Sequence, residues 1–250
     1  MLLCLFVDFC YNFVSFRSAP EFHHFPDATP MNNFTSLPTS SVGRKLVVGL
    51  TGLFLSMFLV MHCTVNLFLL RGDHGELFNS SAEFLATYPV LRPIEIGLFL
   101  LFIVHAFYAV WLWFTNRSAR PDRYVVSRAS DVSTLQSRTM IITAIGVFVF
   151  LVIHIWTFFI SSRFFAGEHG PSMYQRVEEA FANPVYALFY IVAMGFLAYH
   201  LRHGFQSAFQ TYGLRTSKYQ KLIEAVAVVF WLFIPLGFAL MPIYFMFRAH

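Results

Sequence analysis

Histidines inside apolar segments are the residues of this sequence best suited to do chemistry. Four successive apolar segments each contain one, and a further histidine follows the last by three residues: His62, His105, His154, His200 and His203. Ionisable side chains are costly in membrane-spanning segments, so they indicate functional sites by default. A single buried histidine is more often a hydrogen-bonded structural residue, but four in succession favour a functional reading.

Two spacings recur around these histidines and indicate an internal repeat. The first and third are each followed nine residues later by an arginine, His62 by Arg71 and His154 by Arg163. The second and fourth each follow a proline by sixteen residues, His105 after Pro89 and His200 after Pro184. Segments Ser80–Thr87 and Gln175–Ala182, which lead into these prolines, are predicted to be short amphipathic helices. The pattern predicts a diverged duplication around a twofold axis along the membrane normal, with chance agreement as the alternative.

The duplication predicts which histidines face each other. Its axis exchanges the first helix with the third and the second with the fourth, which pairs His62 with His154 and His105 with His200. His62 and His154 each lie about 14 Å from the arginine at the outer end of their helix. This pair is therefore expected at a different depth in the membrane from the pair His105 and His200. Two facing imidazoles suit the axial ligation of a planar haem, and bis-histidine iron favours electron transfer. His203, one turn nearer the cytoplasm, is expected to hydrogen-bond a carboxylate of the cofactor.

The elements that must position these residues are membrane-spanning helices. Hydrophobic residues make up 57% of the 250 residues and charged residues 12%, which excludes a disordered chain, a nucleic-acid-binding domain and an ordinary soluble enzyme. Apolar runs of about 20 residues can cross a bilayer. The sequence has five such runs, Leu46–Leu70, Pro93–Phe114, Met140–Ile160, Pro184–Phe205 and Ile223–Phe247. The predicted fold is an all-α membrane protein with five transmembrane helices, the first four forming a haem-binding four-helix bundle with a pseudo-twofold repeat.

The distribution of basic residues predicts the orientation in the membrane. Twelve basic residues fall on the side of the N-terminus and five on the other, which places the N-terminus in the cytoplasm and the C-terminus outside. Residues 40–250 are predicted to form the transmembrane domain that binds two haems, and residues 1–39 an N-terminal cytoplasmic segment. Residues 1–30 fit poorly with the rest, and a plain alternative is that Met31 is the true start.

Six motifs carry a resemblance to a known family. They are Ser40–Lys45, Leu50–Leu55, Pro89–Phe99, Arg120–Tyr124, Ser137–Met140 and, the most specific, Tyr199–Gln210 (YHLRHGFQSAFQ). With them the chain, from about Asn33 to the C-terminus, resembles the five-helix, di-haem cytochrome b membrane anchor of succinate:quinone oxidoreductase, a subunit type shared with quinol:fumarate reductase. In that family the histidines of helices 1 and 3 bind the distal haem, which implies this role for His62 and His154. Those of helices 2 and 4 bind the proximal haem, which implies this role for His105 and His200.

The resemblance also implies a function and partners. The chain would be the quinone-reactive cytochrome b subunit of a succinate dehydrogenase or fumarate reductase in a bacterial inner membrane. Succinate would be oxidised on a separate FAD-containing flavoprotein subunit, and an iron–sulfur subunit would pass electrons to the inner of two haems b. The outer haem would reduce a membrane quinone, with menaquinone preferred. Lipid is an expected partner and nucleic acid is not.

The remaining candidate residues depend on the same resemblance. Arg71 and Arg163 join His203 as candidate partners of the haem propionates. Polar residues at the outer ends of helices 1 and 3 are candidates for the quinone site, although a solvated loop face explains them equally well: His74, Glu76, Asn79 and Ser161.

Two other functions remain open from the sequence. A transporter or channel could use membrane histidines to relay protons, and it would be colourless. A structural anchor without haem would also lack a spectrum, and it would survive mutation of all four histidines.

Overall fold

The structure, a computed structural model, describes residues 40–118, 135–165 and 170–248. Within these ranges all regular structure is helical, and five segments are long and apolar enough to cross a membrane. They are Val42–Leu70, Leu91–Asn116, Ile141–Phe164, Pro184–Thr211 and Gln220–Arg248. The predicted all-α class and the five spans are therefore confirmed, with ends that differ by a few residues. The predicted N-terminal segment, residues 1–39, lies outside the described residues.

Two of the five spans contain a π-helical turn. The first span is α2 (Ser41–Leu67) with the 3₁₀ turn η2 (Phe68–Leu70), the second is α4 (Leu91–Ser118) and the fourth is α9 (Pro184–Thr211). The third consists of α6 (Leu135–His154), the π-turn η3 (Ile155–Ile160) and α7 (Ser161–Phe164). The fifth consists of α10 (Gln220–Val228), the π-turn η4 (Val229–Phe233) and α11 (Ile234–Arg248). Single π-turns in long helices are frequently found at functional sites, and η3 begins directly after His154.

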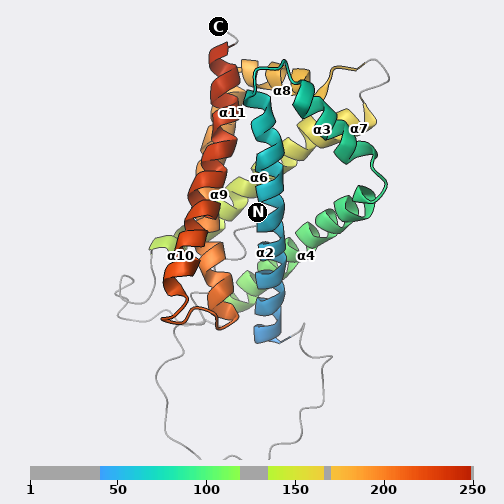
Figure 1. Cartoon of the computed structure of the whole chain (residues 1–250). Helices are drawn as coiled ribbons and strands as arrows, with labels where there is room; N and C mark the ends of the chain where they lie inside the picture. Colours follow the sequence, from blue (N-terminus) through green and yellow to red (C-terminus); the bar gives the residue numbers. More distant parts are fainter. Residues whose placement is uncertain (1–39, 119–134, 166–169, 249–250) are drawn as a thin grey trace, which may run out of the picture.

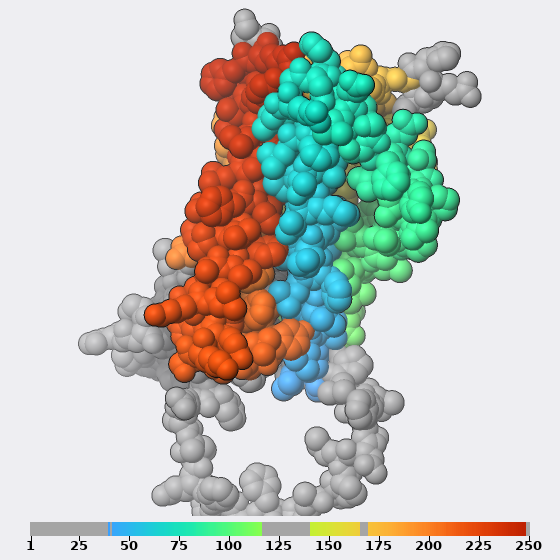
Figure 2. All heavy atoms as spheres, viewed as in Figure 1, coloured from blue at the N-terminus to red at the C-terminus, as the bar shows by residue number. Residues whose placement is uncertain are grey.

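Helices α2 and α9 are the centre of the packing. α2 packs on α4, α9 and α11, and α9 also packs on α6 and α11. Figure 1 shows α4 and α6 crossing the other helices obliquely, and Figure 2 shows α11 lying against α2 along most of its length. Gly237 of α11 allows this approach, because a Cβ there would lie 2.8 Å from Cys63 Sγ. Each helix that carries a predicted ligand therefore packs on α2 or α9.

Two short amphipathic helices, α3 (Glu76–Thr87) and α8 (Met173–Ala182), cover one end of the bundle. They confirm the short helices predicted around Ser80–Thr87 and Gln175–Ala182. Asn79 Oδ1 accepts a hydrogen bond from the Tyr174 backbone N–H at 3.0 Å. Gly75 has φ 83°, and a Cβ there would lie 2.2 Å from the Tyr174 ring, so both backbone and space require glycine. We call this the α3–α8 end.

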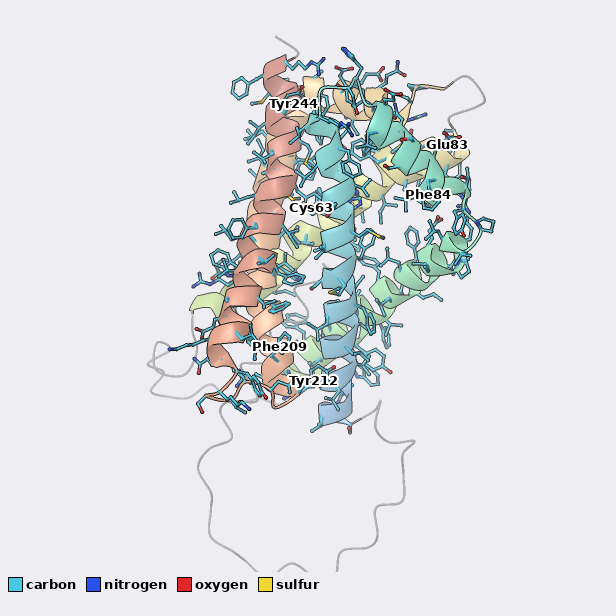
Figure 3. The ribbon with its side chains drawn as sticks, in the orientation of Figure 1. Cys63, Glu83, Phe84, Phe209, Tyr212 and Tyr244 are labelled. Atoms are coloured by element: carbon cyan, nitrogen blue, oxygen red, sulfur yellow. The ribbon has the colours of Figure 1, made fainter. Side chains whose placement is uncertain are left out.

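The opposite end carries the N-terminus of α2 and the C-terminus of α9. Figure 3 marks the two ends by Tyr244 at the α3–α8 end and by Tyr212 and Phe209 at the opposite end. Tyr212 Oη donates to the Leu46 carbonyl at 2.7 Å and ties α9 to α2. Burial raises the pKa of the Tyr212 phenol, so the group stays protonated and remains a hydrogen-bond donor at neutral pH.

Candidate functional site

His62 of α2 and His154 of α6 lie in direct contact. Their ring centroids are 5.7 Å apart, and their planes are nearly perpendicular at 84°. Phenylalanine rings border both imidazoles: Phe58, Phe150, Phe158 and Phe238. The structure therefore brings together, in an apolar setting, the two histidines that the sequence repeat pairs.

A chain of hydroxyl groups runs from His154 towards the α3–α8 end. Tyr190 Oη lies 3.4 Å from His154 Nδ1 and 3.0 Å from Tyr186 Oη, and Tyr186 Oη donates to Thr157 Oγ1 at 3.0 Å. A phenol has one proton, so a Tyr186 that donates to Thr157 accepts from Tyr190. Tyr190 then accepts from His154 Nδ1–H. This order of donors places the proton of His154 on Nδ1 and leaves the Nε2 lone pair available to a ligand.

His105 of α4 has a comparable partner on α2. Its ring is fully buried, and its Nδ1 lies 3.0 Å from Thr51 Oγ1. The Thr51 hydroxyl donates to the Val47 carbonyl at 2.8 Å, so its oxygen accepts from His105 Nδ1–H. A hydrogen bond of this kind fixes the tautomer and orientation of a ligating imidazole.

His200 and His203 of α9 carry buried nitrogen atoms that no described protein group satisfies. His200 is 1% exposed, and both of its ring nitrogens lack a hydrogen-bond partner among the described residues. The same holds for Nε2 of His203, whose ring contacts Tyr199 at 5.5 Å between centroids. A buried polar group without a partner costs about 1–3 kcal/mol. A bound group that uses these nitrogens would offset that cost.

Arg44 is a buried cation at the opposite end of the bundle from α3 and α8. It is 8% exposed, its Nη1 donates to Thr115 Oγ1 at 3.3 Å, and its guanidinium lies 4.8 Å from the Trp111 ring centroid. Within the described residues no carboxylate pairs with it. A buried guanidinium is costly without a counter-charge, so this position suits an anionic group. The sequence placed Arg44 among the basic residues of the N-terminal side and in the motif Ser40–Lys45, but did not predict that it is buried.

The other predicted residues lie at the α3–α8 end but do not form one site. Arg71 and Arg163 are both exposed, and Arg71 Nε lies 3.8 Å from Asp73 Oδ2. Of the four quinone-site candidates, His74 and Glu76 are exposed. The other two, Asn79 and Ser161, form hydrogen bonds with residues of α8. Asn79 accepts from the Tyr174 backbone, and Ser161 Oγ accepts from Arg176 Nη1 at 2.8 Å.

Two cavities at this end are lined by other residues. One, of about 320 Å³, is lined by Val65, Ser80, Ser81, Phe84 and Leu85. The other, of about 280 Å³, is lined by Thr157, Glu179, Ala180, Asn183 and Tyr186. None of the four quinone-site candidates is among these residues.

His62 and His154 fit a cofactor held by two imidazoles. Metal–imidazole bonds of about 2 Å to one ion would place the two ligating nitrogens about 4 Å apart and the two ring centroids about 6 Å apart. Rings whose centroids lie 5.7 Å apart come close to this separation. Within the described residues no group of three or more His, Cys, Asp or Glu side chains gathers as a metal site would require. The arrangement therefore suits paired axial ligands better than a tetrahedral metal centre.

Comparison with known proteins gives one match. Residues 115–236 match the family described as "Succinate dehydrogenase/Fumarate reductase transmembrane subunit". The matched segment contains His154, His200 and His203, whereas His62 and His105 precede it. No curated protein and no solved structure matches the chain.

Proposed function

We propose that the chain is a member of the succinate dehydrogenase/fumarate reductase transmembrane subunit family, whose match covers residues 115–236, and that it carries electrons between the rest of such a complex and a membrane quinone. As a member it would be a multi-pass membrane subunit that associates with the other subunits of the complex, in keeping with its five long apolar helices. The finer roles of individual residues are our proposal, and they rest on the geometry described above.

We assign the four histidines to two haems b. His62 and His154 would hold the outer haem, and His105 and His200 the inner haem. The observation that carries this assignment is the contact between His62 and His154, which lie on separate helices and face each other among aromatic rings. The unsatisfied nitrogens of His200 support a ligand at the second site. When bound, such a haem supplies one-electron redox chemistry at an iron with no open coordination position.

Buried cations and donors are assigned to the haem carboxylates. Arg44 and His203 are our candidates for the inner haem, because both are largely removed from solvent and Arg44 lacks a described acidic partner. Arg71 and Arg163 remain candidates for the outer haem, although both are exposed.

Residues next to the histidines fix the tautomers of the imidazole rings and shield them from water. Thr51 and Tyr190 hold the Nδ1 protons of His105 and His154, so that each imidazole presents its Nε2 lone pair. The aromatic rings beside His62 and His154 exclude water and lower the local dielectric constant, and both factors tune a redox potential.

The proposed path runs through the membrane from the cytoplasmic side. The distribution of basic residues favours a cytoplasmic N-terminus of α2, and an iron–sulfur subunit docked there would deliver electrons to the inner haem. The electrons would originate on an FAD-containing flavoprotein subunit. The outer haem would then reduce a quinone, menaquinone being preferred, in a bacterial inner membrane; fumarate reduction would use the reverse path.

Haem content and absorption of the purified complex test this function. We expect a low-spin b-type spectrum that succinate reduces, and a pyridine haemochrome assay that gives two haems per copy of this chain. A colourless protein would favour the alternative of a histidine-containing proton or ion transporter. One haem per chain would contradict the assignment of two pairs.

Thr51 is predicted to set the potential of the inner haem. Thr51→Val removes the side-chain partner of His105 Nδ1–H and leaves the hydrogen bond to the Val48 backbone, which makes the imidazole a poorer electron donor and stabilises reduced iron. We expect the inner midpoint potential to rise by on the order of 40 mV, the equivalent of about 1 kcal/mol for one electron. Redox titration measures the change, and Thr51→Ser should restore the original value.

Ser56 of the same helix provides the matched control. It is buried, and its hydroxyl donates to the Gly52 carbonyl at 2.9 Å. Ser56→Ala should leave both midpoints unchanged. Equal titrations of Thr51→Val, Ser56→Ala and the wild type would show that Thr51 does not act on His105.

A further inference from the structure

An open cavity with a mostly apolar surface and a few polar side chains lies next to the π-turn η3 that follows His154. Its volume is about 280 Å³, which suits a single ring system better than a large ligand. Three elements supply the walls: Thr157 of η3, Glu179 and Ala180 of α8, and Asn183 and Tyr186 at the start of α9. Sequence reasoning singled out none of these residues.

The cavity is connected to His154 by hydrogen bonds. Thr157 and Tyr186, which line it, form the far end of the chain that runs through Tyr190 to His154 Nδ1. The π-turn contributes Thr157 to this chain, and π-turns are frequent at functional sites. His154, a proposed haem ligand, is therefore connected through a continuous chain of hydroxyl groups to a cavity beside a π-turn.

We propose that this cavity binds the head group of the membrane quinone, an inference that rests on the proposed function of the chain. Tyr186 can turn its hydroxyl from Thr157 to a quinone carbonyl oxygen while it still accepts from Tyr190. This bond stabilises the negative charge that develops on the oxygen as electrons arrive. Tyr186 thus both holds the ring and orients one carbonyl.

Glu179 is the proton-exchanging group of this site. It is exposed to solvent while also lining the cavity, so its carboxyl group can take a proton from water and pass it to the ring. The reaction is quinone + 2 e⁻ + 2 H⁺ → quinol, in which both C=O groups become C–OH. A haem held by His62 and His154 would supply the electrons one at a time, and the aqueous phase would supply the protons.

The second cavity at this end offers fewer donors to such a ligand. Its two hydroxyl groups, on Ser80 and Ser81, both donate to the Leu77 carbonyl, at 3.0 and 2.7 Å. No described hydrogen bond joins its lining residues to a histidine. Its residues therefore provide the matched control.

Rapid mixing of the intact complex in membranes tests the proposal. The haems are first reduced with succinate, and their reoxidation is followed after addition of 2,3-dimethyl-1,4-naphthoquinone at increasing concentrations. We expect Tyr186→Phe to raise the half-saturating quinone concentration about tenfold, the effect of one lost hydrogen bond. Glu179→Gln should lower the maximal reoxidation rate by on the order of 100-fold. Ser81→Ala should change neither quantity.

The same experiment separates failure of this site from failure of the function. If succinate reduces the haems normally in all variants, and both cavity variants reoxidise with wild-type constants, the cavity is not the quinone site and the proposed function stands. If succinate fails to reduce haem in the wild-type complex, both the proposed electron-transfer function and the proposed quinone site are wrong. Should Tyr186→Phe lose haem, the exposed Glu179→Gln variant decides the outcome alone.

Discussion

Replacement of His200 by alanine is expected to remove one of two haems, whereas replacement of His203 should keep both. His200 is fully buried with both ring nitrogens unsatisfied in the described protein, as expected of an axial ligand in the absence of its partner. His203 lies three residues further along α9, about 4.5 Å along the axis and about 60° around it. An imidazole at that offset cannot occupy the axial position opposite His105.

His200→Ala and His203→Ala should differ in haem content and not only in midpoint potential. Loss of an iron ligand abolishes haem binding, whereas loss of one hydrogen bond to a propionate costs about 1–3 kcal/mol and shifts the midpoint potential. The pyridine haemochrome assay should give one haem per chain for His200→Ala and two for His203→Ala. Redox titration should then find an altered inner midpoint in His203→Ala. One haem in His203→Ala, with two in His200→Ala, would reverse the assignment.

Replacement of His62 or His154 by alanine is expected to remove the outer haem and to block quinone turnover. The two rings touch at 5.7 Å between centroids, so removal of either leaves the other without its opposite ligand. The inner haem, which we assign to His105 and His200, should still be reduced by succinate. Low-temperature spectra of the reduced complex resolve the two components and measure which one is lost.

The pairing scheme itself is tested by comparing variants across the two pairs. His62→Ala and His154→Ala should lose the same spectral component, and His105→Ala and His200→Ala the other. Tyr190→Phe serves as a control beside His154, because it removes a hydrogen bond to Nδ1 but no ligand; it should shift the outer midpoint and retain both haems. Loss of one component by both His62→Ala and His105→Ala would contradict the pairing.

The sequence alone determined the features that depend on local composition and on the repeat. Five runs of apolar residues defined the spans, because a helix of about 20 apolar residues satisfies its own backbone hydrogen bonds in lipid. The repeat paired His62 with His154 before any contact was known, since helices related by a twofold axis carry equivalent residues at equal depth. The short helices α3 and α8 followed from their amphipathic pattern and from the prolines after them.

Only the tertiary structure decided which side chains meet across helices. Thr51 and His105 are 54 residues apart, and Tyr190 and His154 are 36 apart. Asn79 and Ser161 were candidates for a quinone site, yet they bond to Tyr174 and Arg176 of α8. Arg44 was one of the basic residues on the side of the N-terminus, yet it is buried against Trp111. Such contacts depend on the tilt and rotation of each helix, which are set by packing and which a uniformly apolar sequence leaves open.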